Sequence, residues 1–125
     1  MTENEIGTLI VDSAIRVHRE LGPGLLESVY EAVLAHEISL AGLDVQRQVA
    51  IPVEYKGMRF DEGFRADLLI DQSVLVELKC VEKLHAAHKK QLLTYLRLTN
   101  TRLGYLLNFS ESLMKNGIVR TVNRL

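Results

Sequence analysis

The sequence contains a single cysteine, Cys80, so neither an internal disulfide nor a cysteine-based metal cluster can form. No apolar run approaches the roughly 18 residues that are needed to cross a membrane. The N-terminus has neither the basic segment nor the apolar stretch of a signal peptide. We therefore expect no membrane association and a location in the reducing cytoplasm.

Compositional bias and internal repeats are also absent, which excludes low-complexity and repeat architectures. The 125 residues are enough for one hydrophobic core and too few for a second.

The four histidines show neither an H-x-H nor an H-E-x-x-H spacing, which argues against zinc. No zinc finger or groove-reading helix is evident, so the sequence leaves any base preference open.

The net charge of −1 argues against a general nucleic-acid coat, but the charges are unevenly distributed. From Lys83 to Arg102 there are five basic side chains and no acidic one. Such a segment is typical of a surface that faces phosphates. It is equally typical of a solvated helix face whose charges are balanced by the acidic N-terminal helices.

Hydrophobic periodicity and turn signals predict an α/β domain over residues 1–125, with a mixed β-sheet flanked by helices. A capping box from Thr2 to Glu5 starts the first helix, and Gly22 ends it. Pro52 is expected at a sheet edge or a bulge, and Gly63 at a bend or a bulge. The expected order is ααβββαββ, with helices near 3–21, 26–41 and 84–99 and strands near 45–55, 58–70, 74–81, 102–109 and 118–122.

Two acidic side chains are expected to meet on a hairpin whose turn is centred on Gln72. In that register Asp67 lies opposite Glu77, at a spacing of about 5 Å, and Arg65 lies opposite Lys79. Glu77 and Lys79 share one face because strand side chains alternate. Two carboxylates this close repel each other, so one would take up a proton unless a cation lay between them.

This group of charges has two interpretations. Mg²⁺ accepts carboxylate ligands while keeping several waters, stabilises charge on a phosphoryl oxygen and lowers the pKa of a bound water. Lys79 would then orient that water and offset phosphate charge, which suggests phosphodiester hydrolysis. The alternative is a surface lattice of ion pairs that joins Arg65 to Glu77 and Asp67 to Lys79. The spacing alone does not separate the two.

Several motifs along the chain resemble one nuclease superfamily. Arg65-Ala-Asp67 with Glu77-Leu-Lys79 resembles the signature of the PD-(D/E)XK nucleases, and Gly24-Leu-Leu-Glu27-Ser-Val-Tyr30 resembles the pattern that names the GxxExxY family within them. Gln91-Leu-Leu-Thr-Tyr95 is similar to the Q-x-x-x-Y motif of RecB-type exonucleases. Further similarity to the family lies at 17–24, 106–109 and 117–120. The motifs follow the family's order over essentially the whole chain and imply a restriction-endonuclease-like core.

The resemblance also implies roles for single residues. Mg²⁺, with Mn²⁺ as a substitute, would be held by three carboxylates and a carbonyl. Catalysis would depend on Asp67, Glu77 and Lys79. The implied metal ligands are Glu27, Asp67, Glu77 and the Leu78 carbonyl, and the implied nucleic-acid contacts are Gln91 and Tyr95. The basic segment adds Lys83, Lys89, Lys90 and Arg97 as expected phosphate contacts.

Some of these residues have structural alternatives. Glu27 is expected in the first helical turn, where a carboxylate is favoured by the helix dipole alone. Tyr30 shares the helix face of Glu27 and either braces it or serves as a core aromatic. Gln91 and Tyr95 are one turn apart and could form a structural hydrogen-bonded pair. His18 belongs to a family motif, but the sequence gives it no role.

Three functions are thus compatible with the sequence. The first is a Mg²⁺-dependent nuclease, with DNA favoured over RNA as the substrate. The second is a non-catalytic nucleic-acid-binding or assembly module that has kept the fold and the site. The third is a structural protein in which the hairpin charges only pair. So small a nuclease core also suggests a second copy or a protein partner, which would help it to grip a duplex.

Overall fold

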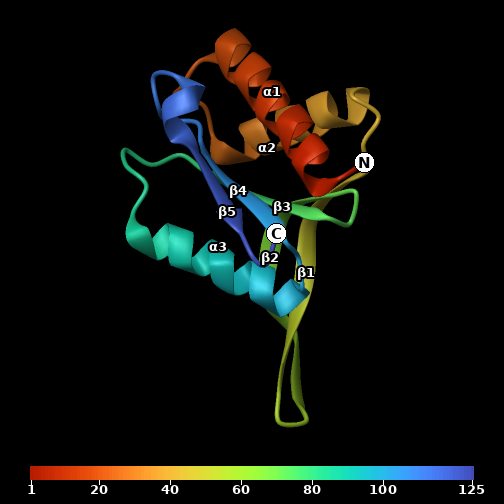
Figure 1. Cartoon of the computed structure of the whole chain (residues 1–125). Coiled ribbons are helices and arrows are strands. Elements are labelled where there is room, and N and C mark those ends of the chain that lie inside the picture. The colour runs from red at the N-terminus through yellow and green to blue at the C-terminus, as the bar shows by residue number, and fades with distance from the viewer.

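The structure, a computed structural model, describes all 125 residues and contains the predicted order ααβββαββ (Figure 1). A short 3₁₀ helix, which the sequence did not indicate, precedes the last strand. The elements are α1 (Glu3–Leu21), α2 (Glu27–Leu40), β1 (Val45–Tyr55), β2 (Met58–Ile70), β3 (Val74–Lys79), α3 (Ala86–Thr99), β4 (Leu103–Asn108), η1 (Met114–Gly117) and β5 (Ile118–Val122).

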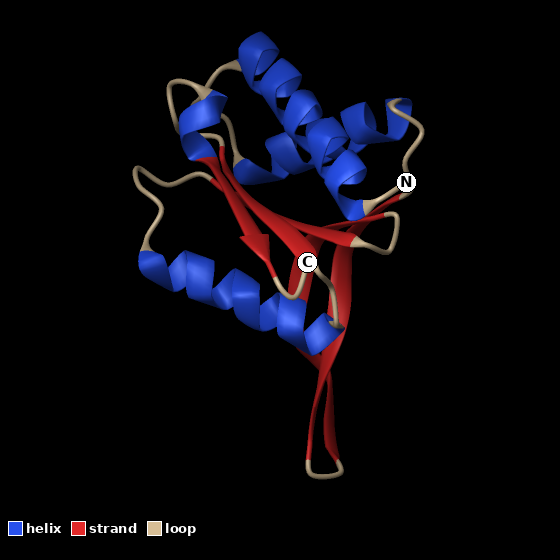
Figure 2. Ribbon diagram, viewed as in Figure 1, coloured by secondary structure: helices blue, strands red, loops and turns tan.

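The five strands form one mixed sheet in the order β1-β2-β3-β4-β5. Only β3 and β4 run parallel, and α3 makes the crossover between them. Helices α1 and α2 cover one face of the sheet and α3 covers the other (Figures 1 and 2). This is the predicted α/β architecture, and it is consistent with a restriction-endonuclease-like core. None of the helices has the length and apolar content needed to cross a membrane.

Strand β3 ends at Lys79, two residues earlier than predicted, although Cys80 and Val81 are strand-forming residues. The reason lies in β4, where the Asn108 side chain replaces a ladder partner. Its Oδ1 accepts a hydrogen bond from the Val81 N–H at 3.1 Å, and its Nδ2 donates to the Val81 carbonyl at 2.8 Å. The Asn108 side-chain amide therefore satisfies the backbone N–H and carbonyl of Val81, and β3 does not continue through this residue.

The loop between α1 and α2 is fixed by Tyr30, which is fully buried. Its hydroxyl donates to the Gly22 carbonyl at 2.5 Å and accepts from the Leu25 N–H at 3.1 Å. Its ring stacks on Phe109, with centroids 4.5 Å apart. Tyr30 is thus a core aromatic that holds the first turn of α2, and with it Glu27, against the sheet.

Strands β1 and β2 continue beyond the body of the molecule as a two-stranded hairpin (Figures 1 and 2). Their register shifts between Ile51 and Val53, so Pro52 lies both on the edge strand and at the irregularity, as predicted. A Cβ atom on Gly63 would collide with the Val53 side chain, which explains why a glycine stands at this bend.

Candidate active site

The predicted site lies where β3 ends, between the first turn of α2 and the α3 side of the sheet. Leu78 packs into the core under α1 and α2, whereas Leu75 packs against α3. Since side chains alternate along β3, Glu77 and Lys79 share the α3 side with Leu75, as the sequence predicts. Glu27 is the first residue of α2.

The β2–β3 ladder is centred on Gln72, as predicted, but it ends at the pair Leu68–Val76. Asp67 and Glu77 still meet through contacts between side chain and backbone. The Asp67 N–H donates to Glu77 Oε2 at 3.3 Å, and the Leu78 N–H donates to Asp67 Oδ2 at 2.9 Å. The two carboxylates therefore adjoin each other.

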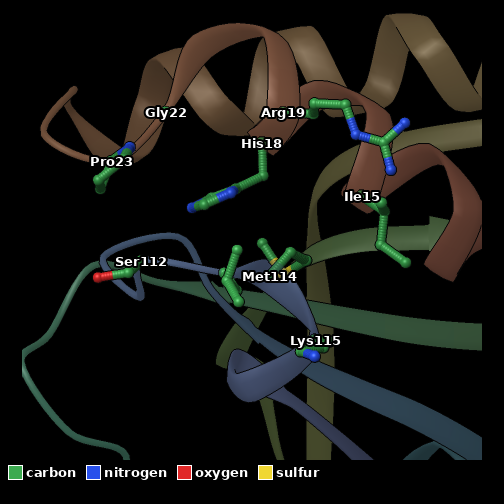
Figure 3. A pocket seen from close by; sticks show the side chains of 9 residues that line it. Ile15, His18, Arg19, Gly22, Pro23, Ser112, Met114 and Lys115 are labelled. Carbon is green, nitrogen blue, oxygen red and sulfur yellow. The ribbon is translucent and has the colours of Figure 1, made fainter.

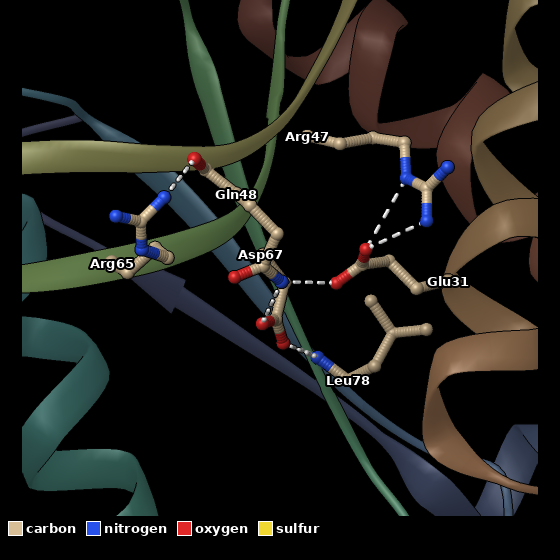
Figure 4. Close-up of polar contacts among 6 residues, drawn as sticks. All are labelled: Glu31, Arg47, Gln48, Arg65, Asp67 and Leu78. Atoms are coloured by element: carbon tan, nitrogen blue, oxygen red, sulfur yellow. Dashed lines mark hydrogen bonds and ion pairs between the residues drawn. The ribbon is translucent and has the colours of Figure 1, made fainter.

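A kink in β2 ends the ladder there. Ala66 packs on the α3 side and Leu68 on the opposite side, although residues two apart on a regular strand share a face. On the neighbouring β1, Gln48 has a left-handed backbone with φ of 50° and is skipped by the strand pairing. The irregularity turns Asp67 toward β3 (Figure 4).

The expected pairing of Arg65 with Lys79 does not occur. Arg65 forms an ion pair with Glu62 at 2.6 Å and donates to the Gln48 carbonyl at 3.1 Å, while Lys79 lies opposite Asn108 of β4. The kink draws Arg65 toward β1 and away from β3. No ion pair in the structure involves a carboxylate or the lysine of the predicted site, so the alternative of a surface salt-bridge lattice is wrong.

Glu77 is the most unusual carboxyl group of the chain. The residue is 6% exposed, and its Oε1 is buried without any hydrogen-bond partner. Burial raises the pKa of Glu77 to about 9, helped by a hydrogen bond with Asp67 and by the Asp67 charge. The nearby Lys79 charge acts in the opposite direction but does not prevail. Without a bound cation, Glu77 is protonated at neutral pH.

Glu27 approaches Asp67 and Lys79 from α2. Although the residue as a whole is exposed, enclosure of its carboxyl group raises its pKa, and the Asp67 charge adds to this effect. The Lys79 charge and the Cys80 backbone N–H lower the pKa of Glu27. Glu27 thus lies near both Asp67 and Lys79, in addition to the helix-dipole position that the sequence indicated for it.

Tyr95 faces the carboxylates from α3. Burial raises the pKa of its hydroxyl, and the charges of Glu77 and Asp67 raise it further, while a hydrogen bond with Gln91 lowers it. The ring lies flat on Phe64 of β2, with centroids 3.7 Å apart and planes inclined by 8°. Gln91 and Tyr95 therefore form a pair on α3, and Tyr95 also lies next to the acidic group.

The basic side chains before and along α3 are exposed and form no ion pair. They are Lys83, Lys89, Lys90 and Arg97. Of the basic residues from 83 to 102, only Arg102 reaches an N-terminal carboxylate, that of Glu3 at 3.7 Å. Apart from Arg102, these cations therefore form no ion pair with the acidic N-terminal helices, and their exposure also fits a solvated helix face.

Three residues that the sequence did not suggest support Asp67 (Figure 4). Glu31, 7% exposed, accepts two hydrogen bonds from the Arg47 guanidinium at 3.1 and 3.2 Å. Gln48 Nε2 donates to Glu31 Oε1 at 2.5 Å and to Asp67 Oδ1 at 3.2 Å. Glu31 lies one helical turn after Glu27, a spacing that could have drawn attention to it. Gln48 gives no such signal.

The largest hollow of the molecule lies elsewhere, between the end of α1 and η1 (Figure 3). It has a volume of about 590 Å³, is lined by Arg19 and Lys115 among others, and contains none of the predicted site residues. In its wall, His18 Nε2 lies 2.7 Å from the Glu111 carbonyl and ties α1 to the segment before η1. His18, whose role the sequence left open, is therefore a structural residue here.

A divalent cation fits the chemistry of the site carboxylates, although their present positions do not form a complete coordination site. No three histidine, cysteine, aspartate or glutamate side chains converge closely enough to hold an ion as they stand. Glu77 Oε1 nevertheless has no hydrogen-bond partner, and a buried oxygen normally has a hydrogen-bond donor or a metal ion beside it. The donors around it are carboxylate oxygens, which Mg²⁺ prefers, and a cation would relieve their repulsion.

Comparison with known proteins agrees with this geometry. The family model of the PD-(D/E)XK nuclease superfamily matches residues 4–121, a span that contains all of the predicted site residues. No curated protein and no solved structure gives a significant match. Nucleases of this superfamily generally use divalent metal ions, and their substrates are nucleic acids. The chain belongs to the PD-(D/E)XK nuclease superfamily.

Proposed function

We propose that this protein is a Mg²⁺-dependent nuclease that hydrolyses phosphodiester bonds in nucleic acid, with DNA as the preferred substrate. The observation that carries the proposal is the buried Glu77, whose Oε1 has no partner and whose carboxyl group adjoins Asp67. An unpartnered buried oxygen and a strongly raised carboxyl pKa are costly for a merely structural residue, and they are typical of functional sites.

In the proposed site, Glu27, Asp67, Glu77 and the Leu78 carbonyl hold the ion. The ion supplies Lewis-acid stabilisation of the phosphoryl oxygen and lowers the pKa of a bound water. Lys79 is half-exposed and forms no ion pair, so its ammonium group is free to orient a water or to neutralise phosphate charge.

Nucleic acid lies along α3 in this proposal. Gln91 and Tyr95 contact the backbone next to the carboxylates, and the cations that form no ion pair neutralise phosphates on either side. Those cations are Lys83, Lys89, Lys90 and Arg97. Because phosphate contacts carry no sequence information, binding is expected to be largely independent of base sequence.

Three further features complete the proposal. Residues 1–125 act as one nuclease-like domain of the GxxExxY family, a placement supported by Gly24, Glu27 and Tyr30. The compartment is the cytoplasm, where the unpaired Cys80 stays reduced. A second copy or a protein partner assists the grip on a duplex.

One observation favours a second candidate, a non-catalytic module that binds nucleic acid or assembles with partners. The carboxylates are too far apart to coordinate one ion together, so ion binding requires their side chains to move closer to one another. Metal binding without cleavage would identify this function.

Cleavage assays separate the two candidates. Single- and double-stranded DNA and RNA are incubated with the wild type, Lys79→Ala and Lys115→Ala, in Mg²⁺ and in Mn²⁺. The proposal predicts cleavage by the wild type and by Lys115→Ala, which removes an equivalent exposed charge at a hollow that contains none of the site residues. Lys79→Ala should retain metal and nucleic-acid binding while its cleavage rate falls on the order of 100-fold or more. A wild type that binds metal but cuts none of these substrates would favour the non-catalytic module.

A further inference from the structure

The projecting part of the β1–β2 hairpin, residues 52–63, is amphipathic and is called the arm below. The pairs Tyr55–Met58 and Val53–Phe60 lie directly opposite each other across the two strands. Directly opposed residues, and residues two apart on a strand, share a face of the sheet. Over residues 53–60, where the pairing is regular, one face of the arm is therefore apolar. Three of its side chains are unusually exposed, at 65% for Tyr55, 58% for Met58 and 57% for Phe60.

The other face of the arm is charged, but its charges are already satisfied within the arm. Arg59 forms ion pairs of 3.1 Å with both Glu54 and Asp61. Lys56, at the turn, lies over the Tyr55 ring at 5.3 Å from its centroid. Since no cluster of free cations remains, the arm is poorly suited to phosphate binding. Its exposed apolar face is instead typical of a surface that another protein covers.

An uncharged hollow, lined in part by hydrophobic side chains, lies at the base of the same hairpin. It has a volume of about 490 Å³, and no charged residue contributes to its wall. Leu98, at the end of α3, lines it and is 45% exposed. Ile51, also in the wall, is four residues before Tyr55 on β1, a distance of about 13 Å along a strand. The arm points away from the body, so its tip cannot reach this hollow in its own chain (Figure 2).

We propose that the arm and the hollow bind each other between two copies of this chain. In this dimer the two arms pack antiparallel to each other through their apolar faces. The tip of each arm then lies at the base of the partner's arm. Each tip then covers the partner's hollow, and the two identical contacts close around a two-fold axis. This inference extends the second-copy part of the proposed function, but association can be measured without any cleavage, so either can fail alone.

The area of the contact favours this two-way exchange. At roughly 200 Å² for each fully exposed side chain, the arm and Leu98 offer on the order of 450 Å² of apolar surface per copy. Two copies contribute about 900 Å², which corresponds to about 1,500 Å² in an interface that is about 60% apolar. That value lies within the range of roughly 1,200–2,000 Å² for stable complexes, whereas a one-way contact would provide only half of it.

Sedimentation velocity over a concentration series tests the proposal. The wild type should be dimeric at tens of micromolar. Tyr55→Thr/Phe60→Thr keeps strand-forming residues but removes the apolar tip, and its dissociation constant should rise on the order of 100-fold or more. Leu40→Thr removes an exposed leucine from the end of α2 and should stay dimeric. A monomeric wild type, or a double variant that dimerises normally, would overturn the proposal.

A disulfide trap tests the tip-to-base geometry independently of affinity. Met58→Cys and Leu98→Cys are combined with Cys80→Ser, so that no native thiol interferes. Mild oxidation should give a covalent dimer and no larger species on a non-reducing gel. A ladder of larger species would indicate a one-way, open-ended contact and overturn the two-fold exchange. Failure to cross-link in a protein that still dimerises would place the dimer interface elsewhere.

Discussion

Replacing Glu77 by glutamine should stabilise the metal-free protein at neutral pH, although Glu77 lies in the middle of the proposed site. The folded protein holds this carboxyl group with a pKa of about 9, because it is buried beside Asp67. In the unfolded chain the group has its model value of 4.5. Folding at pH 7 therefore requires the uptake of a proton, and glutamine removes that requirement while keeping a donor toward Asp67.

The direction and size of the effect follow from linkage. Because the folded pKa is raised, the contribution of Glu77 to stability is fully present below pH 4.5 and is lost as the pH rises toward 9. At pH 7 the loss spans about 2.5 pH units at about 1.4 kcal/mol each, or roughly 3–4 kcal/mol. Glu77→Gln should thus be more stable than the wild type by roughly 3–4 kcal/mol at pH 7 and by almost nothing at pH 4.

Urea unfolding in EDTA at pH 4, 5.5, 7 and 8.5 measures this difference, provided that the slope of each transition is unchanged. Glu82→Gln, which alters an exposed carboxylate without an ion pair, should reproduce the wild-type pH profile. In Mg²⁺ the wild type should gain stability and Glu77→Gln should not. A variant that is no more stable than the wild type at pH 7, or a difference that does not change with pH, would refute the reasoning.

Three further predictions concern the same site and helix. Ion binding must displace the proton of the buried Glu77, so the affinity for Mg²⁺ should rise by up to tenfold per pH unit between about pH 6 and pH 9. Calorimetry in buffers of different ionisation enthalpy should detect the released proton. Gln48→Ala removes a hydrogen bond to Asp67, so Mn²⁺ affinity measured by calorimetry should fall on the order of 10-fold. Gln46→Ala, on the same strand, should leave that affinity unchanged, and equal losses in both variants would contradict the positioning role. Lys89→Ala/Lys90→Ala should flatten the salt dependence of DNA binding by about 2 in log–log slope, and an unaltered slope would exclude these contacts.

The sequence predicted the order of elements because its periodicity and turn signals are strong. The strands over 45–55, 58–70 and 118–122 have their predicted bounds. It also predicted that Asp67 and Glu77 meet, since a turn centred on Gln72 fixes the register of a hairpin. Local spacing along one hairpin was enough for this part of the site.

The rest of the site depends on tertiary contacts that local patterns do not encode. Gln48 adopts a left-handed backbone without the glycine or asparagine that usually signals one. The irregularity beside Gln48 ends the β2–β3 ladder at Leu68 and Val76, and Arg65 pairs with Glu62 instead of lying opposite Lys79. The ion pair between the buried Glu31 and the half-exposed Arg47 joins α2 to β1, and no spacing within one element predicts such a pair.

Diffraction from crystals soaked in Mn²⁺ tests the central claim most directly, because the anomalous signal locates the ion without reference to activity. The account predicts one strong peak within coordination distance of Asp67 and Glu77, with Glu27 drawn toward it. The peak should disappear in crystals of Asp67→Asn grown and soaked in the same way. Fully occupied Mn²⁺ elsewhere, with no peak beside Glu77, would contradict the claim that these carboxylates form a metal-dependent nuclease site.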